Sequence, residues 1–220
     1  MGFLTVMIDL DPQCDLSKMY QQDPADGPTI FELLRGECSM ENACLLVSEN
    51  LYLVRGSRDT IHFQSKNGEH TLACCLQDSA MAEVDFVIID HPPTLSESAL
   101  AGYVASDAVL IVTDTESFSL ANLTYLVENL LNIQQTMNPA LSIVGIVANK
   151  VDLRRNLTKT MLHELTSGFG DYVLASWVSY DTAIPTAIRR GQTLRQLPWQ
   201  SRTVQQFKSR TSEVLERMAN

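Results

Sequence analysis

The stretch Val6–Gln13, "VMIDLDPQ", decides the fold class of this chain. Its apolar run ends in Asp9, and a second carboxylate, Asp11, follows two residues later. An apolar run of this kind is typical of a strand buried on both faces of a parallel sheet. We therefore predict that the strand delivers Asp9 and Asp11 to its carboxyl end, where such a pair usually faces a metal ion or a phosphate.

Strand-like and helix-like segments alternate along the rest of the chain. The expected strands are residues 3–8, 51–54, 84–89, 107–112, 142–148 and 172–175. The expected helices are residues 29–35, 71–82, 97–104, 119–137, 156–167 and 202–218. This alternation predicts an α/β fold, in which helices cover both faces of a mostly parallel, twisted sheet.

Length and composition predict a single domain, residues 1–220. With 45% hydrophobic and 19% charged residues, the 24.5 kDa chain is neither disordered nor fibrous. The five cysteines are odd in number and form no C-x-x-C pair, which argues against a disulfide framework or a zinc site and favours a reducing compartment. No apolar run approaches the ~20 residues of a membrane span, so we expect a soluble, cytoplasmic protein with no membrane partner.

Charge is distributed unevenly along the chain. The formal net charge is −10, but residues 1–150 hold 6 basic and 20 acidic residues, whereas residues 151–220 hold 10 basic and 6 acidic ones. A basic region after an acidic body is typical of a surface that faces a polyanion, and a solvated helix face would give the same count. The sequence leaves these two interpretations open.

A second carboxylate-bearing strand end lies at Asp90. This residue follows the apolar run 86–89 and precedes Pro92 and Pro93, which cannot continue a strand ladder. A carboxylate placed there can hold Mg²⁺ through water beside a triphosphate, because Mg²⁺ prefers oxygen ligands and keeps several waters. The alternative is a carboxylate that only caps a helix or a loop.

The segment Asn149–Asp152, "NKVD", follows another buried strand and matches the N-K-x-D pattern with which GTPases recognise guanine. The amide of Asn149 can serve either purine, whereas Asp152 would have to accept hydrogen bonds from guanine to select it. The alternative is a turn in which both side chains bond the backbone.

A phosphate-binding loop of the form G-x-x-x-x-G-K-[ST] is not in this sequence. Such a loop closes backbone N–H groups around the phosphates while its lysine neutralises them. None of the ten glycines is followed by lysine.

Five stretches, taken in order, resemble the ParA/Soj/MinD family of deviant Walker ATPases, which partition plasmids and chromosomes or position cellular cargo. They are "GFLTVMIDLDPQCDLS", "FVIIDHPPTLSESAL", "DAVLIVTDTESFSLANL", "GIVANKVDLRRNLTK" and "AIPTAIRRGQTL". The resemblance spans essentially the whole chain. It implies ATP and Mg²⁺ as cofactors, a homodimer, and nonspecific DNA and a centromere-binding or cargo adaptor protein as partners.

The resemblance also implies roles for individual residues. Asp11 would match the catalytic aspartate that positions the attacking water, and Asp90 the Walker B aspartate that holds the water shell of Mg²⁺. The residues implied at the nucleotide are Asp9, Asn149, Ile184 and Pro185. The residues implied at the DNA surface are Arg189, Arg190 and Arg195, and the nearby basic residues that we expect to add to it are Arg202, Lys208 and Arg210.

The chain departs from the family pattern in three places. Cys14 and Asp15 stand where glycine and asparagine are usual, and His91 replaces a residue that is commonly small or threonine. The family's first strand, phosphate loop and following helix, about 30 residues in typical units of this kind, are missing.

That missing strand is central in the family, between the strand that ends at Asp90 and the strand 107–112. Its loss would leave two ladder edges unpaired, and each unsatisfied buried backbone group costs about 1–3 kcal/mol against a total stability of roughly 5–15 kcal/mol. We therefore expect that the two strands close on each other, that a partner supplies a strand, or that the natural product begins upstream of Met1.

The leading hypothesis is a ParA-like partition protein, related to ATP and Mg²⁺, that binds DNA nonspecifically and hydrolyses ATP poorly. The first alternative is a non-enzymatic scaffold that binds a partner or DNA with the same fold. The second is a GTPase-like protein that uses the "NKVD" motif.

Overall fold

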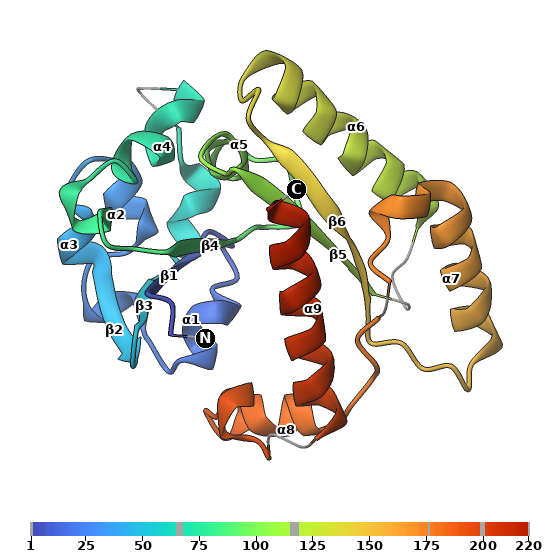
Figure 1. Ribbon diagram of the computed structural model, residues 1–220. Coiled ribbons are helices and arrows are strands. Elements are labelled where there is room, and N and C mark those ends of the chain that lie inside the picture. The colour runs from blue at the N-terminus through green and yellow to red at the C-terminus, as the bar shows by residue number, and fades with distance from the viewer. Residues whose placement is uncertain (1, 65–67, 115–118, 176, 199–200, 220) are drawn as a thin grey trace. The chain divides into compact units, whose positions relative to one another are not determined.

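The structure is a computed structural model that describes residues 2–64, 68–114, 119–175, 177–198 and 201–219 (Figure 1). It divides into two compact units, Met1–Ser106 and Asp107–Asn220, and each is described by itself.

The first unit is built on a four-stranded sheet in the order β2-β3-β1-β4 (Figure 1). The strands are β1 (Thr5–Asp9), β2 (Cys44–Ser48), β3 (Leu51–Val54) and β4 (Phe86–Asp90). β1 lies between two parallel neighbours, with Asp9 opposite Asp90 on β4. Because parallel strands end at the same edge of a sheet, the last residues of β1 and β4 come together there.

Short helices surround this sheet. They are α1 (Asp15–Met19), α2 (Ile30–Leu34), α3 (Met40–Ala43), α4 (Thr71–Cys75) and α5 (Glu97–Val104). α2 begins at a capping box, in which the Thr29 side chain accepts from the first turn and Glu32 bonds back to the Thr29 backbone. The core of the unit joins β1 to these helices through fully buried side chains that include Ile8, Leu10 and Ile30.

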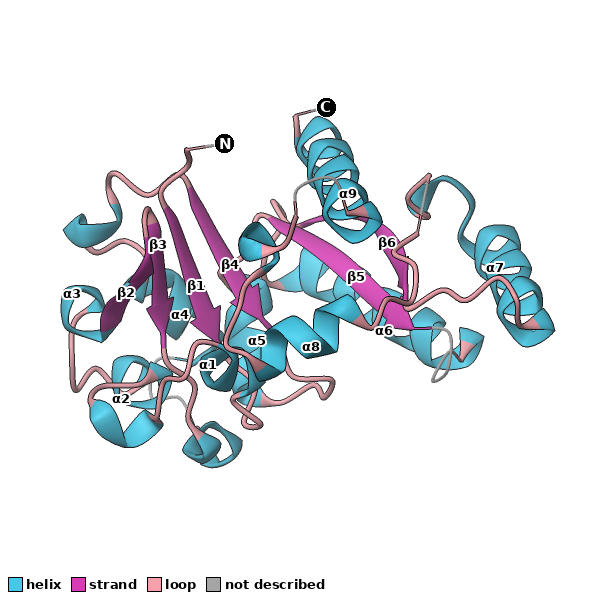
Figure 2. Cartoon of the chain, turned by 90° about the horizontal axis from the view of Figure 1, so that it is seen from below, coloured by secondary structure: helices cyan, strands magenta, loops and turns pink. Residues whose placement is uncertain are grey.

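The second unit holds β5 (Ala108–Asp114) and β6 (Ser142–Asn149), paired in parallel so that Asp114 lies opposite Asn149. Its helices are α6 (Leu120–Thr136), α7 (Asn156–Phe169), α8 (Ala183–Arg189) and α9 (Arg202–Met218). Figure 2 shows the strand pair between α9 on one side and α6 on the other. The mostly parallel α/β fold is thus confirmed, and the helices predicted at 119–137 and 202–218 lie where expected.

The predicted elements need correction in several places, and the short helices α1, α3 and α8 were not predicted. β2 was not expected; it forms an antiparallel hairpin with β3 through a turn in which Asn50 adopts a φ of 55°. The helix predicted at 71–82 ends at Cys75, and a separate 3₁₀ turn, Ser79–Met81, follows because the Asp78 side chain accepts from the backbone of that turn.

The strand predicted at 172–175 is only an isolated bridge between Val173 and Ile146. Arg217 of α9 explains the difference, because its guanidinium donates to the carbonyls of Asp171, Tyr172 and Val173. A side chain therefore satisfies backbone groups that a strand ladder would otherwise use.

Each sheet ends in an edge strand among the described residues, β4 in the first unit and β5 in the second. Within the described residues, β4 pairs only with β1, and β5 pairs only with β6. Apolar side chains on these edge strands are correspondingly exposed: Ile88 by 56%, Leu110 by 39% and Val112 by 59%. The three outcomes expected for these two strands stay predictions.

Among the described helices, none is both long enough and apolar enough to cross a membrane.

Candidate functional site at the carboxyl ends of β1 and β4

The site begins with two carboxylates on neighbouring strands. Asp9 ends β1, is fully buried, and lies opposite Asp90, which ends β4. Burial raises the pKa of Asp9 above its ordinary value, although hydrogen bonds from Ser17 oppose the shift. Asp90 is exposed at the surface, yet the protein around it reduces its hydration and raises the pKa of its carboxyl to about 6, and Asp9, Asp11 and Asp15 add to the shift. Negative charge is thus concentrated at this edge of the sheet.

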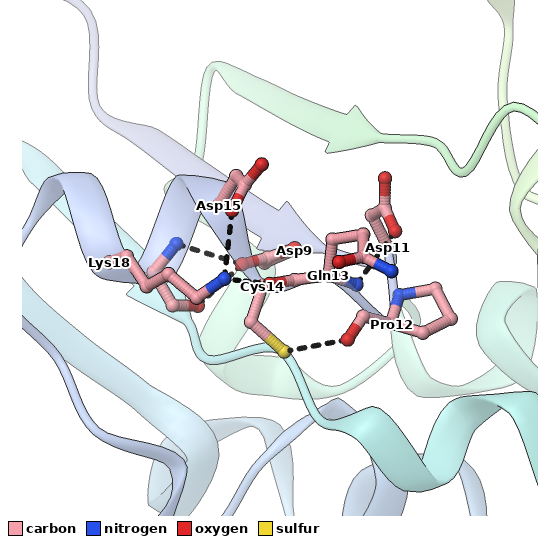
Figure 3. A network of polar contacts seen from close by, with 8 residues as sticks. Asp9, Asp11, Pro12, Gln13, Cys14, Asp15 and Lys18 are labelled. Atoms are coloured by element: carbon pink, nitrogen blue, oxygen red, sulfur yellow. Dashed lines mark hydrogen bonds and ion pairs between the residues drawn. The ribbon is translucent and has the colours of Figure 1, made fainter.

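Asp11 lies just beyond the strand, in a tight turn (Figure 3). Its Oδ1 accepts from the backbone N–H of Gln13 at 2.8 Å, and its carbonyl accepts from the N–H of Cys14 at 2.9 Å. Cys14 adopts a φ of 55°, which is strained for any residue with a Cβ, and α1 begins directly after it. This conformation explains physically why glycine suits the position.

The Asp9 side chain points into the protein and not toward solvent. Its Oδ2 accepts from the N–H of Ser17 at 2.8 Å and from the Ser17 hydroxyl at 2.5 Å. The Ser17 Oγ in turn accepts from the backbone N–H of Gly56 at 2.9 Å. The other carboxylate oxygen, Oδ1, is buried and has no hydrogen bond of good geometry within the described residues, although the Asp11 backbone lies close enough to lower the pKa of Asp9. Asp9 therefore joins three segments of the first unit: β1, α1 and the loop after β3.

His91, directly after Asp90, packs against α5. Its ring stacks on Tyr103 with 4.2 Å between centroids, and burial lowers the pKa of the imidazole to about 4. A Cβ on Gly102 would lie 2.4 Å from the His91 ring, so the ring fills the space that this glycine leaves. His91 is therefore neutral at pH 7 and fixed by packing.

Asn149 and the "NKVD" segment lie in the second unit, where β6 ends. The Asn149 Oδ1 accepts from the N–H of Lys150, and Lys150 adopts a φ of 53° and pairs with Asp114 at 3.3 Å. Both oxygens of Asp152 bond the Arg154 guanidinium at 2.8 Å, and these bonds lower the pKa of Asp152 to about 2. The carboxylate that guanine recognition would need is thus already occupied.

Ile184 and Pro185 lie in the first turn of α8, Ile184 half-buried and Pro185 exposed. The roles predicted for these two residues and for Asn149 stay predictions.

The predicted DNA-binding residues also lie in the second unit. Arg189 ends α8, Arg190 follows it, and both are exposed. Arg202 and Lys208 are exposed on α9, whereas the side chain of Arg195 lies outside the described residues. The expectation that Arg210 adds to this surface is wrong: Arg210 is 9% exposed and donates to the carbonyl of Trp177 at 3.0 Å.

The carboxylates of the first unit suit Mg²⁺ in their chemistry, because they offer only oxygen and, within the described residues, one buried oxygen of Asp9 has no hydrogen bond of good geometry. They do not form a closed cage, since the described residues contain no group of three or more side chains that could hold a metal ion. Mg²⁺ usually keeps several waters and takes one or two carboxylates together with phosphate oxygens. The residues present therefore fit a hydrated ion beside a phosphate.

A mostly parallel sheet with acidic residues at the carboxyl ends of adjacent strands is the arrangement of a P-loop NTPase-like protein. The chain belongs to the ParA family, and residues 1–143 match the family model AAA_31, described as an AAA domain. The chromosome-partitioning ATPase Soj of Treponema pallidum is 28% identical over 193 residues, which are 86% of this chain and 73% of that protein.

Solved structures share the fold. A variant of McdA from Cyanothece, solved in complex with ATP, has a TM-score of 0.84 at 18% identity, and the match covers 100% of this chain and 86% of McdA. Cobyrinic acid a,c-diamide synthase of Mycobacterium smegmatis, solved with ADP and magnesium, has a TM-score of 0.74 at 24% identity, and the match covers 86% of this chain and 80% of the enzyme.

Sequence reasoning placed the carboxylates at the correct edge but missed the residues that hold them. Ser17 and Gly56 carry no motif, and they reach Asp9 only through the fold. The one signal that the sequence offers for the Asp11 turn is Cys14, which stands where glycine is usual in the family and where the structure requires a positive φ.

Proposed function

We propose that this chain is a ParA-type partition protein that responds to ATP and Mg²⁺ through its first unit and binds DNA nonspecifically through its second. The proposal depends above all on the position of Asp9 opposite Asp90 at the carboxyl ends of β1 and β4, with Asp11 in the turn that follows. Family membership and the nucleotide-bound structures that share the fold support it.

Each carboxylate has a separate task in this proposal. Asp11, in the turn beyond β1, would orient the water that attacks the terminal phosphate, and Asp90 would hold the water shell of Mg²⁺. The ion would supply charge neutralisation on the phosphates. Hydrolysis by these 220 residues alone should nevertheless be slow, because they include no lysine-bearing phosphate loop to stabilise the charge that develops.

Nucleotide titration tests the first half of the proposal. Labelled ATP and GTP are titrated in Mg²⁺ buffer, and we expect binding that prefers ATP, because Arg154 already occupies Asp152. Preference for GTP would favour the GTPase-like alternative, and no binding of either nucleotide would favour the non-enzymatic scaffold. ATP turnover at a rate typical of the family, lost in Asp11→Ala, would contradict the slow hydrolysis.

A salt series tests DNA binding. Exposed arginines at the end of α8 release counterions from duplex DNA on contact, so binding should be independent of DNA sequence, with a Kd on the order of 10⁻⁴ to 10⁻⁶ M, and should weaken steeply with salt. Arg189→Glu/Arg190→Glu should abolish it. The matched control is Arg155→Glu/Lys159→Glu, which changes the charge equally on the same unit but lies at α7. Equal binding by wild type and Arg189→Glu/Arg190→Glu would refute this surface.

A further inference from the structure

We propose that Asp9, Ser17 and Gly56 form a clasp that positions Asp11. The inference rests on the proposed function for the role of Asp11, whereas the clasp itself follows from the geometry of the first unit. In this proposal Asp9 is a positioning residue that acts through Ser17, and it need not touch the nucleotide.

The clasp closes a short loop of chain. Asp9 is the last residue of β1 and Ser17 lies within α1, so the hydrogen bonds between them tie together the two ends of segment 9–17. Asp11 lies inside this closed segment (Figure 3). Since both ends of the segment are fixed to the same carboxylate, the turn that presents Asp11 has little freedom to move. Opening the clasp would release that turn from α1.

Gly56 fixes the clasp to a third segment. Its N–H donates to the Ser17 Oγ, and a Cβ at this position would lie 2.8 Å from the Asp9 carboxylate carbon. The glycine is therefore required by close approach of the loop backbone to Asp9. The Ser17 hydroxyl is both a donor and an acceptor, because it donates to Asp9 and accepts from the N–H of Gly56. Removal of this one hydroxyl breaks both bonds.

The arrangement is costly for stability alone. Asp9 is fully buried, and within the described residues its Oδ1 has no hydrogen bond of good geometry. A buried carboxylate with an unpartnered oxygen destabilises a fold relative to a fully bonded polar group. An apolar residue would serve packing better, so we infer that the carboxylate is there to hold Ser17 and, through it, the Asp11 turn.

The test uses amide hydrogen exchange of the full chain, measured residue by residue by NMR, in the absence of nucleotide. Ser17→Ala should speed exchange of the Gly56 N–H roughly tenfold, because that N–H loses its acceptor. It should also speed exchange of the Gln13 N–H, which bonds Asp11 and so reports the position of Asp11. Ser17→Thr keeps the hydroxyl and should restore both rates.

Ser39→Ala is the matched control. Ser39 caps α3 in the same unit through its Oγ, which accepts from the N–H of Asn42, and it has no part in the clasp. This variant should leave the Gly56 and Gln13 rates unchanged. Ser17→Ala keeps the bond from the Ser17 backbone N–H to Asp9, so the variant tests the hydroxyl. Faster exchange at Gly56 alone would show that the Ser17 hydroxyl does not position Asp11, and unchanged exchange at Gly56 would show that the clasp does not form; either result overturns the proposal.

The readout separates this proposal from the proposed function. If wild type binds no nucleotide, the proposed function fails, yet the exchange rates still decide whether the clasp exists and whether it holds Asp11.

Discussion

Replacing Asp90 by asparagine should stabilise the protein at neutral pH. Asp90 ends β4 opposite Asp9, and its pKa is raised from 3.8 to about 6 by partial burial and by the neighbouring acids Asp9, Asp11 and Asp15. A carboxyl whose pKa is higher in the folded state stabilises the fold at low pH, and that contribution is lost as the pH rises through the folded pKa. Asparagine has nearly the same size and carries no charge at any pH.

The magnitude follows from the pKa difference and from the exposure of the side chain. A shift of about two units would correspond to about 3 kcal/mol if the group were fully desolvated. Asp90 keeps contact with solvent, which screens the repulsion, so we discount this to about 1 kcal/mol. Asp90→Asn should therefore be about 1 kcal/mol more stable than wild type above pH 7. The difference should shrink between pH 6 and pH 4 and vanish below the unfolded pKa.

Urea denaturation at several pH values measures this difference. Far-UV circular dichroism is the appropriate signal, because both tryptophans of the chain, Trp177 and Trp199, come after residue 106 and report on the second unit. Asp26→Asn is the control, since Asp26 is exposed in a separate 3₁₀ turn, and it should show little change at any pH. Equal or lower stability of Asp90→Asn at pH 7, or a gain that does not fall with pH, would refute the reasoning.

Three further predictions concern packing, and urea denaturation checks each of them. Ile88→Lys should change stability by less than about 0.5 kcal/mol because the Ile88 side chain is 56% exposed, whereas Ile8→Lys, in the core, should cost more than about 4 kcal/mol. Similar losses from the two variants would mean that the Ile88 side chain is covered. Gly102→Ala should cost about 1–2 kcal/mol, because its Cβ meets the His91 ring, and a neutral result would show that the ring can move aside. Cys14→Val should be less stable than Cys14→Gly by about 1–3 kcal/mol because of the positive φ, and the reverse order would contradict that backbone conformation.

The strands that form the site could be predicted because their signal is local. β1 and β4 are apolar runs that end in aspartate, and both features are visible within a few residues. β2 was missed because its short segment is not separated from β3 by any strong turn dipeptide; only Asn50, in a left-handed conformation, marks the hairpin. The segment around Val173 was predicted as a strand because the sequence gives no sign that Arg217, which is distant in the sequence, donates to the carbonyl of Val173.

The two aspartates of "IDLDP" show where sequence reasoning stops. Both follow the same apolar run, and apart from the different roles that the family resemblance implies, the sequence offers no reason to expect different surroundings for them. In the structure, Asp9 is still part of the strand ladder, whereas Asp11 lies past the ladder in a turn. Whether a carboxylate at the end of a strand is buried depends on what covers it, and here Gly56 and Ser17 do so from other segments. That information exists only in the fold.

The acidic residues at the carboxyl ends of β1 and β4 also argue against a purely structural role for this edge of the sheet. Within the described residues, the buried Oδ1 of Asp9 has no hydrogen bond of good geometry, and reduced hydration and neighbouring negative charges raise the pKa of Asp90 to about 6. Stability alone would favour neutral residues at both positions. A cation bound beside Asp9 and Asp90 would reduce the repulsion between their negative charges. The stability that Asp90→Asn gains at neutral pH therefore indicates how much stability such a cation could add to the wild type. Mg²⁺ should accordingly raise the stability of wild type more than that of Asp90→Asn, and an equal effect on both would separate the carboxylate cluster from cation binding.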